Sequence, residues 1–308
     1  MTVPLELDRG LHRIDLQFQA QPGVIAAYLF EDAGERALIE TGPTSTLDAL
    51  LHGLALLDVD PTSISKILVT HIHLDHAGAA GTLIRRFPQA HLYVHEIGAP
   101  HMIDPERLLV SARRIYGEQM DSLWGAFEPV PDARVHPLTD GDTVVVGDNA
   151  LDAIYTPGHA SHHIAYHDAR RHAIFTGDVA GVRLQGLDYV RPPTPPPDLD
   201  LDLWSDSVER IRALQPETLH LTHFGTFTDI ETHFSQLLVR LKAWGYVLKA
   251  NIEDGHDRDQ LIEDLAAFGS EEIRESGADN SAAERLELAT PYFMSVDGYL
   301  RYFRRRSH

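Results

Sequence analysis

Three histidines and an aspartate follow directly on an apolar run in the segment "LVTHIHLDHAG", residues 68–78. Residues two apart in an extended segment face the same side, so His71 and His73 can point at one cation. Asp75 and His76 come next, where the chain turns into the following helix, and this second pair can address a neighbouring cation. The spacing predicts a metal-binding loop at a strand end, and such a loop needs further ligands from elsewhere in the chain.

Three further candidate ligands follow other apolar runs, each beside a glycine. His159 stands in "YTPGHASHH", Asp178 in "FTGDVA" and His223 in "HLTHFG". Glycine lets the backbone bend sharply and leaves room near a bound ion, and a rigid sheet positions ligands at its strand ends. Because the chain has no cysteine, any metal site must use His, Asp and Glu side chains.

The motifs "THIHLDH", "TPGH", "TGD" and "THFG" occur in this order over residues 70–225, and together they resemble the metallo-β-lactamase superfamily. The resemblance implies seven ligands for two divalent metal ions: His71, His73 and His159 for the first, Asp75, His76 and His223 for the second, and Asp178 bridging both. Zinc is the expected metal, and the same ligands also suit iron or manganese.

The fold that the resemblance implies is an α/β fold, an αββα four-layer sandwich with the metals at one edge of the two sheets. The residue pattern agrees, because groups of strands recur on both sides of a helical stretch at about residues 99–130. After Gly225 the composition turns helical and contains no ligand-like cluster. We therefore expect a catalytic domain over residues 1–225 and a helical C-terminal extension over residues 226–308 that packs on it.

One motif departs from the family pattern. The family usually has Asp-Thr-Gly after an early strand, whereas this chain has Glu40, Thr41 and Gly42. A carboxylate at this place normally orients a ligand histidine rather than binding the metal. Since Glu is one methylene longer than Asp, the contact is either kept by an adjusted backbone or lost.

The proline-rich segment "RPPTPPPDLDLDLW", residues 191–204, has two interpretations. Its prolines leave few backbone donors, so "PPTPPP" forms neither a helix nor a central strand. The segment is either a linker or a stiff loop that borders the site, because it lies between two ligand-bearing segments.

The chain has nineteen histidines, and most of them need no role in the site. Of His162 and His163 we expect at most one to reach the pocket, the other interpretation being a surface position at a strand start or a supporting contact. His233 is expected to be packed or exposed on a C-terminal helix. Four others, in polar or turn surroundings, are expected to be solvated: His95, His101, His167 and His172.

The formal net charge of −20 argues against a nucleic-acid partner, which would require a basic surface. No apolar run approaches the ~20 residues of a membrane span, and the N-terminus lacks a signal pattern, so we expect a cytoplasmic protein without a membrane partner. Arg304–Arg306 are expected to form a solvated tail, and no basic cluster for an anionic substrate is evident near the C-terminal helices. The aromatic residues of "PYFMSVDGYLRYF" are expected to pack on the catalytic part, and a homodimer interface is the alternative.

Two cations about 3.5–4 Å apart would deprotonate a bound water and polarise a substrate oxygen. We therefore expect a binuclear metal-dependent hydrolase that uses a metal-bridging hydroxide on a small ester, thioester or lactone. Asp75 is the expected catalytic residue, because it can return a proton to the leaving group. The intact Asp75-His76 pair and the lack of cysteine speak against the main zinc β-lactamases.

Three alternatives remain open from the sequence. The first is an oxidoreductase similar to the persulfide dioxygenases, with a single iron held by His71, His159 and Asp178, since two histidines and one carboxylate suit iron and O₂. The second is a phosphodiesterase or nuclease of the same fold. The third is a non-catalytic binding module that the metal stabilises.

Overall fold

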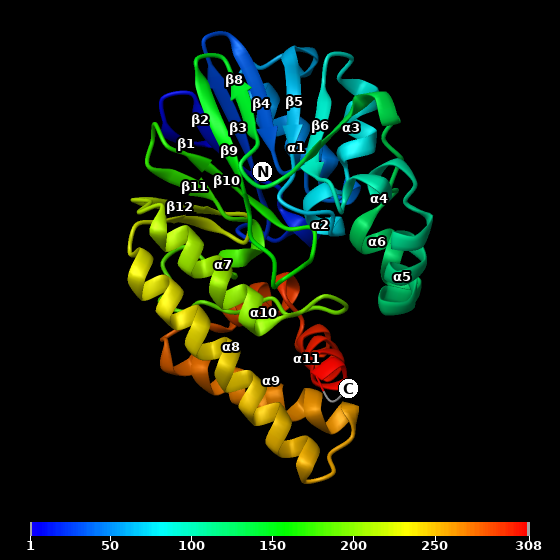
Figure 1. The fold of residues 1–308 in the computed structure, drawn as a ribbon, viewed down its shortest axis with the longest axis vertical. Coiled ribbons are helices and arrows are strands. Elements are labelled where there is room, and N and C mark those ends of the chain that lie inside the picture. The colour runs from blue at the N-terminus through cyan, green and yellow to red at the C-terminus, as the bar shows by residue number, and fades with distance from the viewer. Residues whose placement is uncertain (1, 307–308) are drawn as a thin grey trace.

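The computed structural model describes residues 2–306 and contains two β-sheets packed face to face, with helices on both outer faces (Figure 1). This arrangement confirms the expected αββα sandwich. The last four helices lie in the lower half of Figure 1, beyond the edge of the two sheets.

The first sheet has seven strands in chain order. Its strands are β1 (Leu5–Asp8), β2 (Leu11–Asp15), β3 (Ala26–Asp32), β4 (Glu35–Ile39), β5 (Ile64–Leu68), β6 (His91–His95) and β7 (Val135–Leu138). Strands β1 to β4 pair antiparallel, whereas β4 to β7 pair parallel. The carboxyl ends of β4 and β5 therefore meet at one edge of the sheet.

The second sheet has six strands in the order β13-β12-β11-β10-β9-β8. Their bounds are β8 (Thr143–Val146), β9 (Asn149–Tyr155), β10 (Ile164–Asp168), β11 (Ala173–Phe175), β12 (Thr218–Leu221) and β13 (Gly225–Phe227). Strand β10 is antiparallel to both β9 and β11, and β11 is parallel to β12. Strands β9, β11 and β12 therefore run in one direction, and each is followed by a segment that carries a predicted ligand.

Eleven α-helices of the described chain cover or extend the sandwich. They are α1 (Leu47–Leu56), α2 (Leu74–Ala77), α3 (Ala80–Arg86), α4 (Ala99–Ile103), α5 (Glu106–Tyr116), α6 (Met120–Trp124), α7 (Leu201–Ala213), α8 (Ile230–Glu253), α9 (Arg258–Glu275), α10 (Asn280–Ala289) and α11 (Tyr292–Arg306). None of these helices combines the length and the hydrophobicity that crossing a bilayer requires.

Strand β3 contributes side chains to two layers of the hydrophobic core. Successive side chains of a strand point to opposite faces. Tyr28 and Phe30 join the core between the two sheets, while Ala27 and Leu29 join the core under α1 on the outer face. Because both faces are buried, this strand is apolar along most of its length.

The helices that follow Gly225 share one core with the second sheet. Leu237 and Trp244 of α8 and Tyr299 of α11 belong to the same buried cluster as Leu219 and Leu221 of β12. This contact agrees with the expected packing of the C-terminal helices. The division of the chain after residue 225 remains a prediction, since β13 continues the sheet for two further residues.

Candidate metal centre

The four residues of the first motif stand at the carboxyl end of β5. His71 is fully buried, and His73 precedes α2 with an extended backbone, φ −61° and ψ 154°. Asp75 and His76 lie in the first turn of α2. The predicted same-side placement of the first pair is found, because His71 Nε2 lies 2.9 Å from His73 Nδ1.

Three histidine nitrogens form a first triad. The ligand atoms of His71, His73 and His159 all lie within 4.8 Å of one another, and His159 Nε2 is 3.0 Å from His73 Nδ1. His159 comes from the segment after β9 in the other sheet. The sandwich thus brings together side chains that are 86 residues apart.

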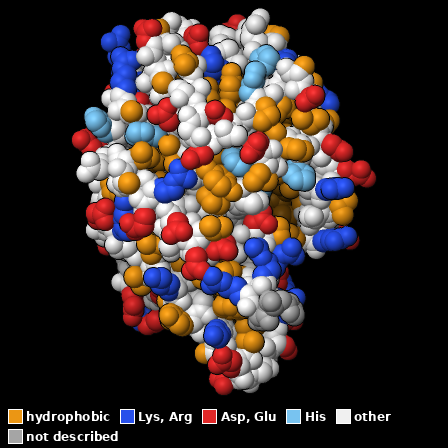
Figure 2. Space-filling model, in the orientation of Figure 1, with side chains coloured by type: hydrophobic (Ala, Val, Ile, Leu, Met, Phe, Trp, Pro, Cys, Tyr) orange, Lys and Arg blue, Asp and Glu red, His pale blue; other side chains and the backbone are white. Residues whose placement is uncertain are grey.

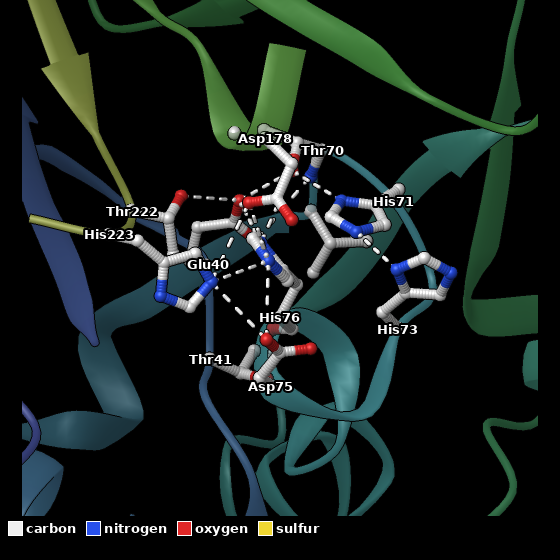
Figure 3. Close-up of polar contacts among 12 residues, drawn as sticks. Glu40, Thr41, Thr70, His71, His73, Asp75, His76, Asp178, Thr222 and His223 are labelled. Atoms are coloured by element: carbon white, nitrogen blue, oxygen red, sulfur yellow. Dashed lines mark hydrogen bonds and ion pairs between the residues drawn. The ribbon is translucent and has the colours of Figure 1, made fainter. Parts of the chain in front are cut away.

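A second triad lies beside the first (Figure 3). The ligand atoms of Asp75, His76 and His223 also lie within 4.8 Å of one another. His223 Nε2 is 3.3 Å from His76 Nε2 and 3.2 Å from Asp75 Oδ2. His223 follows β12, so both triads combine the two sheets.

Asp178 lies between the triads and presents one carboxylate oxygen to each. Its Oδ2 is 3.3 Å from His159 Nε2, and its Oδ1 is 3.2 Å from His76 Nε2. Oδ1 is also buried with no hydrogen-bond donor among residues 2–306. A buried carboxylate oxygen without a donor is costly unless a cation compensates it.

The outer hydrogen bonds fix which ring nitrogen of each histidine faces inward. His159 Nδ1 donates to the Pro193 carbonyl at 2.8 Å, and His223 Nδ1 donates to the Val24 carbonyl at 2.9 Å. In a neutral imidazole the other nitrogen then carries a lone pair. Both Nε2 lone pairs therefore point into the cluster.

Glu40 orients His71 and His76 in the same way, His76 by a direct hydrogen bond and His71 through Thr70. The Glu40 carboxylate only accepts, so the Thr70 hydroxyl donates to Glu40 Oε1 at 2.6 Å and accepts from His71 Nδ1 at 3.0 Å. His76 Nδ1 donates to Glu40 Oε1 at 3.0 Å. Lone pairs that face each other at about 3 Å repel unless a cation lies between them, so this donor set fits divalent metal ions.

Glu40 keeps the expected carboxylate contact to a ligand histidine, His76. The residue is buried at 1% exposure and adopts φ 65°, in the left-handed region that a side chain rarely occupies. Its backbone N–H donates to the Leu68 carbonyl at 2.8 Å. The longer side chain of Glu thus meets His76 from a backbone that the packing of β4 on β5 holds in place.

The threonines of the ligand motifs support this carboxylate and the cluster around it. Thr222, which directly precedes His223, donates to Glu40 Oε1 at 3.1 Å. Thr70 does the same from the first sheet. The repeated order of apolar run, threonine and ligand therefore has a structural reason at these two positions.

The proline-rich segment is a loop that borders the site, not a linker. The Pro193 carbonyl accepts the hydrogen bond that fixes His159, so this loop positions a predicted ligand. Its prolines restrict the backbone, which keeps that carbonyl in a defined place.

Burial and neighbouring charges shift the histidine pKa values in opposite directions in the two triads. Burial lowers the pKa of His71 well below its usual value and lowers the pKa of His73 to about 3. Burial also disfavours charged His76, but the carboxylates of Glu40, Asp178 and Asp75 outweigh it and raise the pKa of His76 well above its usual value. Burial raises the pKa of Asp75, yet His76 and His223 outweigh this and bring it to about 2.

His162 and His163 both lie against the ligand cluster and make supporting contacts, which is one of the two interpretations expected for them. His163 Nε2 accepts from the backbone N–H of Asp178 at 3.1 Å, and its Nδ1 lies 2.8 Å from Thr156 Oγ1. His162 lies parallel to His71 at a ring distance of 6.0 Å. The pairing of β9 with β10 could have suggested this, because it places the start of β10 beside the end of β9.

The expectation of a solvated His95 is wrong. The residue is buried at 4% exposure and stacks on Tyr155 at a ring distance of 4.6 Å. It ends β6 beside the second sheet, and the aromatic partner replaces water. His233 is packed as expected, with Nε2 bonded to the Ala180 carbonyl at 2.7 Å.

The chain belongs to the metallo-beta-lactamase superfamily, whose family model matches residues 20–223. Most members of this superfamily are metal-dependent hydrolases. The fold, the motif order and the His/Asp cluster that can hold a metal thus agree with one another.

Several known proteins are similar to this chain over most of its length. A metallo-beta-lactamase fold-containing protein of Sulfurisphaera tokodaii is 24% identical over 273 residues, which cover 87% of this chain and 97% of that protein. A crystal structure of a metallo-beta-lactamase family protein from Thermus thermophilus has a TM-score of 0.74 at 22% identity and covers 98% of this chain and 95% of that one.

Relatives with named activities match a shorter part. A hydroxyacylglutathione hydrolase of Aeromonas salmonicida is 31% identical over 59% of this chain, and the match spans 55% of that protein. An atrochrysone carboxyl ACP thioesterase of Aspergillus fumigatus is 28% identical over 61% of this chain, and the match spans 46% of that protein. The matches thus span about half the length of these two relatives.

Proposed function

We propose that this protein is a binuclear metal-dependent hydrolase of small carbonyl esters, with thioesters as the preferred class and lactones as further substrates. The observation that carries the proposal is the placement of Asp178, which offers Oδ2 to one triad and Oδ1 to the other. Such a bridging carboxylate fits two adjacent cations rather than one. The complete second triad supports two metal ions rather than the single iron of the alternative.

The named relatives support the choice of a thioester. A hydroxyacylglutathione hydrolase and an acyl carrier protein thioesterase both act, by their names, on carbonyl–sulfur bonds. The net charge of −20 weakens the alternative of a nuclease. We therefore propose a thioester, rather than a phosphodiester, as the substrate.

When bound, two divalent ions supply an activated water as nucleophile and polarise the substrate carbonyl. The chain's own residues prepare that chemistry. His159 and His223 are held by backbone carbonyls, so their inward nitrogens need no reorientation. The burial of Asp178 strengthens its interactions with cations by excluding water.

Asp75 is the residue that we propose to move the proton. Its side chain is 19% exposed, whereas those of His76 and His223 are almost fully buried. The low pKa of Asp75, to which His76 and His223 contribute, keeps its carboxylate ionised. Its Oδ2 faces His223, and the carboxylate takes the proton of the attacking water and returns it to the leaving thiolate, giving an acid and a thiol.

Metal analysis and a substrate panel test the proposal together. Protein purified without added metal should contain two divalent ions per chain and hydrolyse thioesters faster than lactones, esters or phosphodiesters. One iron per chain with oxygen consumption on a persulfide would instead establish the oxidoreductase. A wild-type protein that hydrolyses nothing in the panel, and that unfolds on metal removal, would establish the binding module.

A further inference from the structure

The C-terminal basic run is helical, and its arginines are exposed as expected. Arg304–Arg306 continue helix α11 to its described end at Arg306. Arg301 and Arg305 are four residues apart, and Arg304 is three residues after Arg301, so these side chains share one helix face. The expectation that the C-terminal helices hold no basic cluster is therefore wrong.

Arg301 and Arg304 line a pocket between α9, α11 and the proline-rich loop, and Arg305 lies on the same helix face. The pocket has a volume of about 380 Å³ and is lined by Pro196, Arg258, Asp297, Leu300, Arg301 and Arg304. Cavities from about 300 Å³ upward accept small-molecule ligands. In Figure 2 a group of Lys and Arg side chains lies near the C-terminal end of α11, below the level at which histidine side chains reach this face of the molecule.

The positive charge of the pocket is not compensated within the described chain. Its acid, Asp297, is engaged by Arg258 through two hydrogen bonds of 2.7 and 2.8 Å. Arg301 and Arg305 donate to the Pro197 carbonyl at 3.1 and 3.3 Å, which fixes their position but supplies no negative charge. None of Arg301, Arg304 and Arg305 has an ion-pair partner among residues 2–306, and for Arg304 no hydrogen bond is found there either.

Two guanidinium groups without ion pairs in the pocket, those of Arg301 and Arg304, match a phosphate better than a single carboxylate. A guanidinium donates two parallel hydrogen bonds to phosphate oxygens, and a phosphate offers oxygens to more than one such group. In a chain of net charge −20 this local excess of positive charge is an exception. Clefts lined by one sign of charge concentrate the oppositely charged ligand.

The pocket is tied to the metal centre by the stiff proline-rich loop. Pro193 holds His159 through its carbonyl, and Pro196 lines the pocket. Three residues of fully extended chain span at most about 11 Å. An extended pantetheine arm, with its two amide units, is longer than this stretch of the loop between Pro193 and Pro196.

We propose that this pocket binds the phosphate of a phosphopantetheine thioester, so that the arm follows the loop and places the thioester at the metal centre. The inference rests on the proposed thioesterase activity and specifies its substrate. The phosphate is shared by two sources, coenzyme A and an acyl carrier protein, and the experiment has one arm for each.

The first test compares two substrates with the same scissile bond. An acyl-coenzyme A carries the phosphate, and the N-acetylcysteamine thioester of the same acyl group lacks it. In Arg304→Glu the ratio of kcat/KM for acyl-coenzyme A to that for the truncated thioester should fall at least tenfold, mainly through KM. Arg86→Glu is the matched control, because Arg86 is exposed in the last turn of α3 and has no ion pair among residues 2–306, and its ratio should equal that of wild type.

The second arm replaces coenzyme A with the same acyl group on a carrier protein. Arg304→Glu should reduce kcat/KM for acyl-coenzyme A, for the acylated carrier protein or for both. The substrate with the larger loss is the physiological one. An unchanged ratio in Arg304→Glu for both sources would overturn the phosphate site.

A direct binding measurement separates this inference from the proposed activity. Calorimetry with free coenzyme A should show binding to wild type that is at least tenfold weaker in Arg304→Glu and weaker for pantetheine without phosphate. Equal binding of coenzyme A and pantetheine would overturn the site. If neither thioester is hydrolysed while the phosphate-dependent binding is found, the proposed activity is wrong and the phosphate site stands.

Discussion

The two triads of the candidate metal centre differ in what lies behind their ligands. The first consists of three histidines whose outer partners include the Thr70 hydroxyl and the Pro193 carbonyl, both neutral. The second contains a carboxylate, Asp75, and has another, Glu40, directly behind His76. One triad is therefore neutral and the other anionic, although they share Asp178.

This difference predicts unequal metal binding. A buried negative charge attracts a cation strongly because water does not screen it, so the second triad should hold its metal more tightly at neutral to alkaline pH. The second triad must also lose protons before it binds, since the pKa of His76 is raised. Four experiments test this comparison, in order of decreasing effect.

Asp178→Asn should have the largest effect, because it removes the negative charge that both triads share. We expect kcat/KM to fall by more than about a hundredfold, since losing a ligand costs more than losing a supporting contact. Elemental analysis should find fewer than two metals per chain. Asp168→Asn is the control, because Asp168 is equally buried but pairs with Arg171 away from the site. If Asp178→Asn still bound two metals tightly, the bridging role of Asp178 would be refuted.

Glu40→Gln should weaken the second site selectively. It removes the charge behind His76 but keeps the size of the side chain, and the loss of such a supporting partner costs about 10–100-fold in metal affinity. A chelator titration should then release the second metal earlier than in wild type, with the first metal unchanged. Glu35→Gln, at the exposed start of β4, the strand that precedes Glu40, should behave as wild type. Equal weakening of both sites would show that the two triads do not differ in this way.

Metal binding at the two triads should differ in pH dependence. Burial keeps the pKa values of His71 and His73 low, so these rings are neutral at pH 7 and release no proton on binding. His76 has a raised pKa because the nearby carboxylates outweigh its burial, so it must release a proton. Affinity at the second site should therefore fall by up to about tenfold per pH unit for each proton released, as the pH drops below the pKa of His76.

Competition with a chelator between pH 6 and pH 8 measures this difference for each metal. The second-site affinity should rise with pH, and the first-site affinity should stay nearly constant once the chelator's own protonation is accounted for. If the affinities for both metals changed equally with pH, the assignment of one neutral and one anionic triad would be contradicted.

Thr222→Val should have the smallest effect, because it removes one of the hydrogen bonds to Glu40 and leaves the charge. A hydrogen bond to a charged group contributes about 1.5–3 kcal/mol, which we expect mainly as a lower free energy of unfolding. Second-site affinity should fall less than in Glu40→Gln. Thr226→Val is the control on the same hairpin, since Thr226 contacts His220 and not Glu40. A larger loss of affinity in Thr222→Val than in Glu40→Gln would mean that hydrogen bonding, not charge, distinguishes the triads.

The contribution of the sequence is clearest at the ligands themselves. His71 and His73 could be paired from their spacing, because the alternation of an extended segment is local. The superfamily and its sandwich fold could be predicted from the order of the four motifs. Whether the seven residues bind metal, which metal they bind and whether the chain forms a dimer remain predictions.

Other features could not be predicted because they depend on contacts between distant segments. The left-handed backbone of Glu40 follows from the packing of β4 on β5. The contact of His163 with the Asp178 backbone joins two turns of the second sheet. The arginine pocket requires α11 to return to the proline-rich loop, about 100 residues earlier in the chain.

By itself, the sequence determined the kinds of ligand that this protein can offer, because the absence of cysteine and the placement of His and Asp after apolar runs are local properties. Only the tertiary structure decided how those ligands are charged. A carboxylate behind one triad, and neutral groups behind the other, arise when the two sheets close over Glu40 and exclude the water that would otherwise screen its charge.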